Sequence, residues 1–298
     1  MSTQVVSVAL PLALAFIMFY LGLTLRVADF RGVLARPRAL AVGLAGQVLL
    51  VPLLGYAVAR GAALEPTLAV GLMVLAACPG GVSSGLLTHL ARGEVALSIV
   101  LTALSSVAAM LTLPLVLDFA LQHFAGRSLQ GELPLADTVR RIFVLTTVPV
   151  LAGMALRAWR PRWIARVEPA AGRAATALFV AIVLATFWSQ RTALLQHLPT
   201  LGPACIALNA LILGLAWLGA GAAGLERRDR IAVATECGLQ NSALGIYVTV
   251  ELLHAPAMSV PSVVYALLMN AGALLFVGWM RRRKAATTGA GAGAADVA

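Results

Sequence analysis

One apolar stretch of the chain carries a concentration of polar side chains, Thr235-Glu236-Cys237-Gly238-Leu239-Gln240-Asn241-Ser242. It lies within residues 231–253, a run long enough to cross a lipid bilayer as a helix. An ionisable side chain at membrane depth is costly, and it usually faces a cavity, a partner group or an ion. Gly238 and Gly245 favour a helix that unwinds partway, which frees backbone groups to contact a ligand. This stretch therefore predicts binding of an ion or polar solute inside a membrane.

A second polar interruption, Cys78-Pro79-Gly80-Gly81-Val82-Ser83-Ser84-Gly85, lies within residues 66–91. Residues 81–85 fit the Gly-x-Ser-x-Gly pattern of serine hydrolases, which needs a preceding strand, a following helix and a histidine base. The four histidines fall at the ends of apolar runs or in outer loops: His89, His123, His197 and His254. An intramembrane serine hydrolase is thus a weak alternative, and we interpret the glycines as a break in a membrane helix.

The surrounding chain is too apolar for a soluble domain, with 60% hydrophobic and 11% charged residues and a mean hydropathy of +0.92. Its apolar runs predict an all-α polytopic membrane protein of nine helices, at about 4–25, 38–59, 66–91, 94–118, 138–158, 172–190, 200–223, 229–253 and 259–280. Six prolines are expected in loops or near helix starts: Pro37, Pro66, Pro161, Pro169, Pro199 and Pro261. Cys78, Cys205 and Cys237 form no Cys-x-x-Cys pair, so we expect neither a structural disulfide nor a zinc site.

The net charge of +10 does not indicate a nucleic-acid partner, because the basic residues lie in short loops between apolar runs. One predicted face collects 17 of the 22 Lys and Arg residues: Arg26, Arg31, Arg36, Arg38, Arg92, Arg157, Arg160, Arg162, Arg166, Arg173, Arg227, Arg228, Arg230, Arg281, Arg282, Arg283 and Lys284. This bias predicts a protein of the inner (plasma) membrane with its amino terminus outside and its carboxyl terminus in the cytoplasm.

The two interruptions predict an inverted repeat. The helices that contain them run in opposite directions, and each is followed by one last helix of its half of the chain. We expect a first repeat of four helices at residues 1–118 and an external loop at 119–137. A second repeat of five helices is expected at 138–284, with a disordered cytoplasmic tail at 285–298. The binding site is expected where the two breaks meet near the midplane.

Glu236 is the only acidic residue predicted to lie deep within a helix, and a carboxylate beside unwound carbonyls suits a hard cation such as sodium. The alternative is a protonated Glu236 that only holds helices together. Gln47, the pair Ser98 and Thr102, Asn241 and Asn270 have a similar ambiguity. Each could bind a ligand, or could form hydrogen bonds between helices or to its own helix.

Taken together, these segments resemble the bile acid:sodium symporter family. The resemblance rests on Cys78-Pro79-Gly80-Gly81, Leu90-Ala91-Arg92-Gly93, Val95-Ala96-Leu97-Ser98 and Glu236-Cys237-Gly238-Leu239-Gln240-Asn241-Ser242, with an early helix similar at residues 17–25. It implies an inverted-repeat fold with a panel domain and a core domain, in which the two broken helices cross. The nine-helix form lacks the first of the ten helices that bacterial members often have.

The resemblance also implies the site residues. One sodium site would use Ser84, Ser98, Thr102 and Glu236. A second would use Gln47, Glu236 and Gln240 with the backbone carbonyls of Cys237 and Leu239. The substrate, a small organic anion, would meet Asn241, Asn270 and the amides after the first break at Val82 and Ser83.

The chain departs from the family pattern at three positions. Gly85 stands where the family usually has an asparagine, which leaves the number of bound sodium ions, one or two, open. Val82 stands where bacterial relatives often have a threonine, and Met269 where some have a histidine.

The function expected from residues and resemblance is secondary active transport by alternating access, not enzymatic catalysis. The substrate would be a bile-acid-like anion or a small carboxylate such as pantoate, carried with sodium. The main alternative is a proton-coupled carrier of organic anions in which Glu236 relays the proton.

Overall fold

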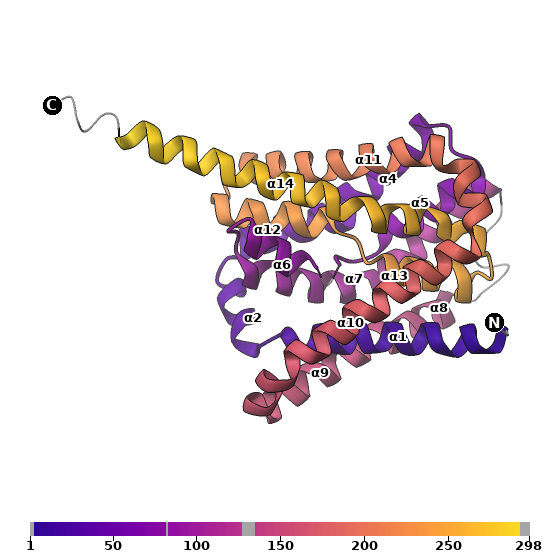
Figure 1. Cartoon of the computed structure of the whole chain (residues 1–298), viewed down its shortest axis with the longest axis horizontal. Helices are drawn as coiled ribbons and strands as arrows, with labels where there is room; N and C mark the ends of the chain where they lie inside the picture. The colour runs from indigo at the N-terminus through magenta and orange to yellow at the C-terminus, as the bar shows by residue number, and fades with distance from the viewer. Residues whose placement is uncertain (1–2, 82, 127–134, 293–298) are drawn as a thin grey trace.

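The computed structural model describes residues 3–81, 83–126 and 135–292, and within these ranges all regular elements are helices (Figure 1). In the first half these are α1 (Thr3–Thr24), α2 (Val27–Leu34), α3 (Pro37–Ala45), η1 (Gly46–Leu50), α4 (Val51–Gly61), α5 (Pro66–Ala77), α6 (Ser84–Leu90), α7 (Val95–Ala120) and η2 (Leu121–Ala125). In the second half they are α8 (Leu135–Ile142), η4 (Phe143–Thr147), α9 (Val148–Trp159), α10 (Pro161–Ser189), α11 (Arg191–Ala222), α12 (Arg227–Gly238), α13 (Ser242–Tyr247), η5 (Val248–Leu252), η6 (Pro256–Ser259) and α14 (Val260–Ala292).

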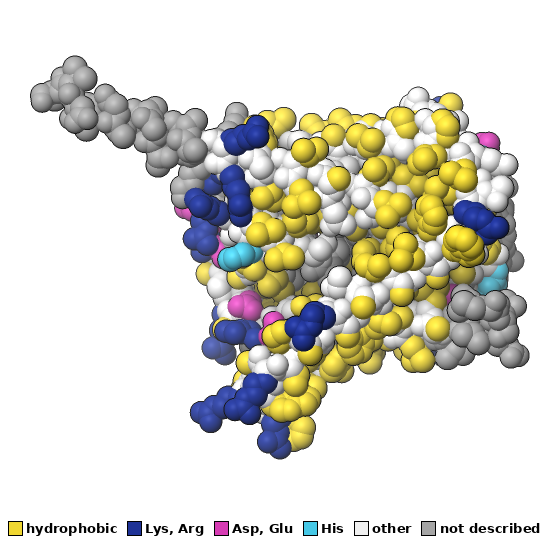
Figure 2. Space-filling view, in the orientation of Figure 1, with side chains coloured by type: hydrophobic (Ala, Val, Ile, Leu, Met, Phe, Trp, Pro, Cys, Tyr) yellow, Lys and Arg dark blue, Asp and Glu magenta, His cyan; other side chains and the backbone are white. Residues whose placement is uncertain are grey.

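Many of these helices are long and apolar enough to cross a membrane. Six described helices qualify by length and composition: Pro37–Gly61, Val95–Ala125, Asp137–Trp159, Pro161–Ser189, Arg191–Ala222 and Pro256–Arg282. The segment Ala9–Thr24 qualifies together with Ala28–Leu34, from which it is bent by 73°. The outer surface between the two ends of the molecule is largely apolar (Figure 2), as lipid contact requires. The chain is therefore a polytopic, all-α membrane protein.

Both expected helix breaks are present. α5 ends at Ala77, and its continuation α6 begins only at Ser84, because Cys78 is extended and Pro79 offers no backbone donor. α12 ends at Gly238, and α13 begins at Ser242 with Asn241 as its N-cap.

Several expected boundaries are wrong. α10 and α11 begin earlier than predicted, at Pro161 and Arg191, so that Pro169 and Pro199 lie inside helices and not in loops. Arginine is a good helix former, and long membrane helices tolerate proline. The arginines and prolines of these two segments therefore do not interrupt the helices.

The two irregular segments that the sequence suggested are also partly helical. Within the expected external loop, helix continues through η2 to Ala125 and resumes at Leu135, with 127–134 outside the described residues. α14 continues to Ala292, into the segment expected to be a disordered tail, because its alanines favour extension of a helix that has already formed. α2 was not predicted at all.

The helices form two groups (Figure 1). α1, α9 and α10 pack on one another along one side of the molecule, and the remaining long helices form a larger group around the two breaks. α1 and α9 approach closely at Gly22 and Gly153, where a Cβ atom would overlap the backbone carbonyls of Val150 and Phe19 respectively. The buried Arg157 of α9 adds a link, because its guanidinium donates to the Leu23 carbonyl of α1.

Basic side chains gather at one end of the molecule (Figure 2). This end contains the beginning of α12 and the turn between α9 and α10 (Figure 1). It also contains an ion-pair network in which Arg36 lies 3.3 Å from Asp229 and 3.6 Å from Glu94, and Arg228 lies 3.4 Å from Glu94. The network joins the segment before α3, the α6–α7 connection and the start of α12, so it fixes the broken helices at this end.

Candidate functional site

The two breaks lie against each other and pair as a short antiparallel bridge between Gly80 and Gln240. The Gly81 amide donates to the Leu239 carbonyl at 2.6 Å, and the Asn241 amide donates to the Pro79 carbonyl at 2.9 Å. Backbone groups that lost their helical partners at the breaks therefore satisfy one another, as a structure inside a membrane requires. We call this place the crossing, comprising residues 78–81, 83, 84 and 236–242.

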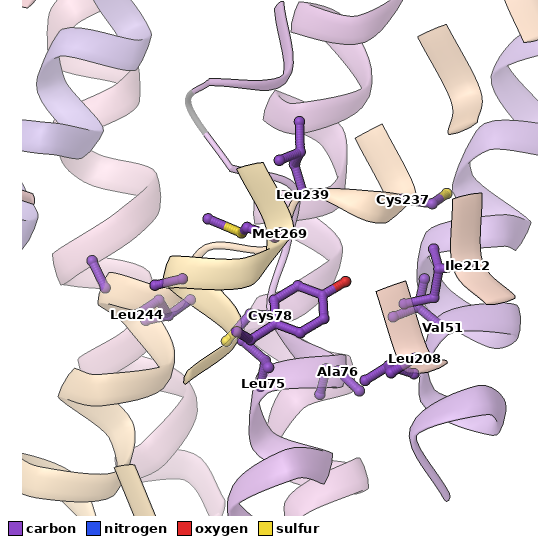
Figure 3. Close-up of a cluster of buried hydrophobic side chains, with 14 of the residues drawn as sticks. Val51, Leu75, Ala76, Cys78, Leu208, Ile212, Cys237, Leu239, Leu244 and Met269 are labelled. Atoms are coloured by element: carbon purple, nitrogen blue, oxygen red, sulfur yellow. The ribbon is translucent and has the colours of Figure 1, made fainter. Parts of the chain in front are cut away.

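Apolar side chains from both halves of the chain enclose the crossing (Figure 3). The cluster includes Leu75, Ala76 and Cys78 from the first break, Leu239 and Leu244 from the second, Val51 from α4, and Leu208 and Ile212 from α11. These side chains separate the polar groups at the crossing from the lipid, so that ionic interactions there are little screened.

Glu236 lies at the centre of a cluster of oxygen atoms. It is fully buried on the last turn of α12, and its Oε2 accepts hydrogen bonds from Thr102 at 2.9 Å and Ser98 at 3.2 Å. The hydroxyl of Ser84, the first residue of α6, lies 3.2 Å from that of Ser98 and 3.3 Å from that of Thr102. The structure thus brings together the four residues predicted for the first sodium site.

A second polar group at the crossing is centred on Gln47. This residue belongs to the π-helical turn η1, next to Pro52, and its Nε2 donates to the Cys78 carbonyl at 2.8 Å and to Gln240 Oε1 at 2.9 Å. π-helical turns often mark functional positions in helices. Gln240 in turn donates to the Cys237 carbonyl at 2.6 Å. Gln47, Cys237 and Gln240 are therefore in contact, whereas the Leu239 carbonyl accepts the Gly81 amide.

Two buried oxygen atoms in these groups have no hydrogen-bond partner among the described residues: Glu236 Oε1 and Gln47 Oε1. Buried polar atoms in proteins nearly always have a partner. A hard cation takes carboxylate, carboxamide, hydroxyl and carbonyl oxygens, which are the groups gathered here. The donor set at the crossing therefore fits an alkali cation.

The residues expected to contact the substrate are less closely grouped. Asn241 caps α13 by accepting the Leu244 amide at 3.1 Å, and its Nδ2 lies 3.7 Å from the sulfur of Met18, so it faces α1. Asn270 bonds within its own helix, to the Ala266 carbonyl. Ser83 is half-buried at the start of α6, and Val82 lies outside the described residues.

Two further residues at the crossing, Asn209 and Tyr265, were not predicted as site residues from the sequence. Asn209 Nδ2 donates to the Gly238 carbonyl, the free end of α12, at 2.9 Å and lies 3.1 Å from the Tyr265 hydroxyl. Tyr265 donates to the same carbonyl at 3.0 Å. Asn209 could have been found from the sequence, because it is a lone carboxamide in the apolar run 200–223. The same kind of pattern led to the prediction of Gln47.

Gln47 and Asn209 play matching roles at the two breaks. Gln47 donates to the Cys78 carbonyl just after α5, and Asn209 donates to the Gly238 carbonyl at the end of α12. Each carboxamide comes from a neighbouring long helical segment, η1–α4 in one case and α11 in the other. Each thus satisfies a carbonyl that lost its helical donor where the helix stops.

The fold and the crossing define a membrane protein with a buried, oxygen-lined site between two broken helices. The comparison with protein families identifies it further: the model of the Sodium Bile acid symporter family matches residues 11–197. The chain belongs to this family, as the resemblance of its motifs suggested.

Individual relatives carry names of transporters. The uncharacterized sodium-dependent transporter YocS of Bacillus subtilis is 29% identical over 282 residues, which cover 94% of this chain and 85% of that protein. The probable chloroplastic sodium/metabolite cotransporter BASS2 of Oryza sativa is 30% identical over 90% of this chain but only 63% of its own length. The human ileal sodium/bile acid cotransporter is 27% identical, over 92% of this chain and 79% of that protein. The family and these relatives are transporters and not enzymes.

Proposed function

We propose that the protein is a secondary active transporter that carries an organic anion together with sodium. The observation that carries this proposal is the buried carboxylate of Glu236 at the crossing, surrounded by hydroxyl groups from α6 and α7. A buried ionised carboxylate needs a compensating charge, which a sodium ion provides during transport. The relatives, which are named as a sodium-dependent transporter and as sodium cotransporters, agree with this proposal.

The proposed sodium ligands form two sets that share Glu236. The first comprises Ser84, Ser98, Thr102 and Glu236, which are already in mutual contact. The second comprises Gln47, Glu236, Gln240 and the carbonyls of Cys237 and Leu239. The unpartnered Glu236 Oε1 and Gln47 Oε1 support these two sets. One or two ions could thus bind, with the first set lacking a carboxamide at Gly85.

The proposed architecture has nine spans in an inverted repeat of four and five. The spans would be α1, the six long helices and the two broken helices, α5–α6 and α12–α13–η5. The repeats would occupy 1–118 and 138–284 on either side of the external segment 119–137. The matching roles of Gln47 and Asn209 at the two breaks support this symmetry.

The two helix groups suggest how such a transporter would move. We propose that α1, α9 and α10 form the panel domain and the helices around the crossing form the core domain. Sodium binding at Glu236 would fix the two breaks, and the core would then move against the panel to expose the site alternately on each side. The basic end shown in Figure 2 would face the cytoplasm of a cell whose plasma membrane holds the protein, with the amino terminus outside.

The organic anion would bind between the crossing and α1. Asn241 supports this position because its side chain reaches Met18 of α1 and its backbone belongs to the crossing. The amino end of the helix that begins at Ser242 offers partial positive charge to an anion. Asn270, Ser83 and Val82 are further candidates for substrate contact. A bile-acid-like anion and a small carboxylate such as pantoate are the two substrate classes to test.

Uptake into proteoliposomes tests the proposal. An inward sodium gradient should drive accumulation of labelled taurocholate or pantoate, and an equal choline gradient should not. If a proton gradient drives the same uptake without sodium, the coupling ion is a proton relayed through Glu236 and not sodium. If neither anion accumulates under either gradient, but sodium still raises the thermal stability of the protein, then the proposed substrate class is rejected and the sodium site is not.

A further inference from the structure

A pocket lies outside the crossing, between the last part of α1 and residues 168–177 of α10. Its volume is about 550 Å³, and its walls include Tyr20 of α1 and Glu168, Arg173 and Thr176 of α10. The floor is fixed because Gly172 packs against Tyr20, where a Cβ atom would come 2.7 Å from the phenol oxygen. None of the residues named above for ion or substrate binding lines this pocket.

The charge of this region is strongly positive and locally uncompensated. Between residues 157 and 176 there are five arginines and one acid, Glu168. That acid is paired with the buried Arg157 at 2.5 Å. The other four arginines are exposed, and none forms an ion pair in the described part of the chain: Arg160, Arg162, Arg166 and Arg173. The region therefore offers four positive charges to an external anion.

Helical spacing aligns these charges with the pocket. Arg162, Arg166 and Arg173 are separated by four and seven residues, which places them on one face of α10. Thr176, on the pocket wall, continues the same face. A row of guanidinium groups thus runs along α10 and ends at the pocket.

The depth of the pocket is that of a lipid headgroup. Tyr20 lies one turn before Thr24, where α1 ends, and the exposed Arg26 follows at once. Trp159 and Trp163, 71% and 53% exposed, stand on either side of the α9–α10 turn, as aromatic residues do at a membrane interface. Figure 2 shows the dark blue side chains of this turn next to the apolar surface of the molecule.

We propose that this pocket and the arginine row bind the phosphate headgroup of an anionic phospholipid in the cytoplasmic leaflet. Arg166 and Arg173 contact the phosphate, and Tyr20 offers its hydroxyl group to the polar headgroup. The Thr176 hydroxyl donates to the Gly172 carbonyl, so it serves the headgroup only as an acceptor. The acyl chains follow the apolar outer surface of α10. The site requires only a protein embedded in a membrane, so it is independent of the sodium proposal.

The test compares lipids added to purified, delipidated protein in detergent, with the midpoint of thermal unfolding as the readout. The double variant Arg166→Gln/Arg173→Gln is compared with Arg38→Gln/Arg282→Gln, which removes two exposed arginines outside this row. Dioleoyl phosphatidylglycerol should raise the midpoint of wild type and of the control pair. The double variant should need roughly tenfold more lipid or more, because each basic residue near an anionic lipid surface contributes severalfold to affinity. Dioleoyl phosphatidylcholine and inorganic phosphate should have little effect.

Three outcomes would overturn the proposal. They are an unchanged response of the double variant, an equal loss in the control pair, and an equal stabilisation by phosphatidylcholine. If the double variant does not fold, Arg173→Gln alone replaces it, and native mass spectrometry counts the phosphatidylglycerol molecules retained. Equal retention by wild type and Arg173→Gln would then contradict the assigned site.

Discussion

The Oε1 atom of Glu236 lies directly against the backbone of Gly80, so that a Cβ atom on Gly80 would overlap it. The two residues come from different halves of the chain and meet at the crossing. Position 80 therefore requires glycine, because a side chain there would occupy the space of the buried carboxylate. This contact connects the sequence motif of the first break with the acid of the second.

Gly80→Ala should displace the Glu236 carboxylate and abolish the stabilisation of the protein by sodium. The overlap involves both Oε1 and the carboxylate carbon, and overpacking of a buried site costs about 1–3 kcal/mol. Gly214→Ala is the control, because nothing lies within 4 Å of its Cβ position. Thermal unfolding with and without sodium measures both variants. A normal sodium response in Gly80→Ala would show that this contact is unimportant for the ion.

Gly85→Asn should strengthen sodium binding, provided that Ile99 makes room. A Cβ atom at position 85 would lie 3.2 Å from Ile99 Cγ1, and so Ile99→Ala, which removes that atom, is made together with it. The new carboxamide would add an oxygen next to Ser84, and the sodium concentration at half-maximal stabilisation should fall severalfold. Ile99→Ala alone is the control. An unchanged sodium concentration at half-maximal stabilisation, relative to that control, would mean that an asparagine at position 85 does not contact the ion in this protein.

Asn209→Leu removes one of two buried donors to the Gly238 carbonyl, and it should cost less than the roughly 1–3 kcal/mol of an unsatisfied buried carbonyl, because Tyr265 still donates to it. Tyr265→Phe removes the second donor to the same carbonyl. Only the double variant should show that full cost. The two effects should not add, since either donor alone leaves the carbonyl satisfied. A double-mutant cycle of unfolding midpoints measures the coupling, with Asn270→Leu as a carboxamide control whose bond is to its own helix. Additive effects would mean that the two side chains do not share a role at the end of α12.

The sequence predicted the crossing well because breaks in membrane helices have strong local causes. Pro79 is followed by two glycines, and Gly238 has polar neighbours, and in each case this local combination favours the end of a helix. The isolation of Glu236 in an apolar run likewise marked the site without any knowledge of the fold. The spacing of four residues placed Ser98 and Thr102 on one helical face, but only the family resemblance assigned them to a sodium site.

Other features depend on tertiary contacts, which the sequence could not provide. The role of Asn209 follows from a carbonyl on another helix, α12, and nothing near Asn209 in the chain indicates it. Pro169 and Pro199 suggested loops, but packing and the membrane setting favour continuous helices there. α14 extends past residue 285 because a helix that has already formed propagates easily. The prediction of a disordered tail considered only the composition of residues 285–298.

The most direct test of the account is the thermal stability of the purified protein across a sodium series, balanced with choline at constant ionic strength. Wild type is compared with Glu236→Gln, which keeps the shape of the side chain, and with Glu251→Gln, an acid outside the crossing. Sodium at about 100 times its dissociation constant should stabilise wild type and Glu251→Gln by about 2.7 kcal/mol, and Glu236→Gln should not respond. A folded wild type that is indifferent to sodium, or a Glu236→Gln variant that responds equally, would contradict the proposal that Glu236 binds the coupling ion.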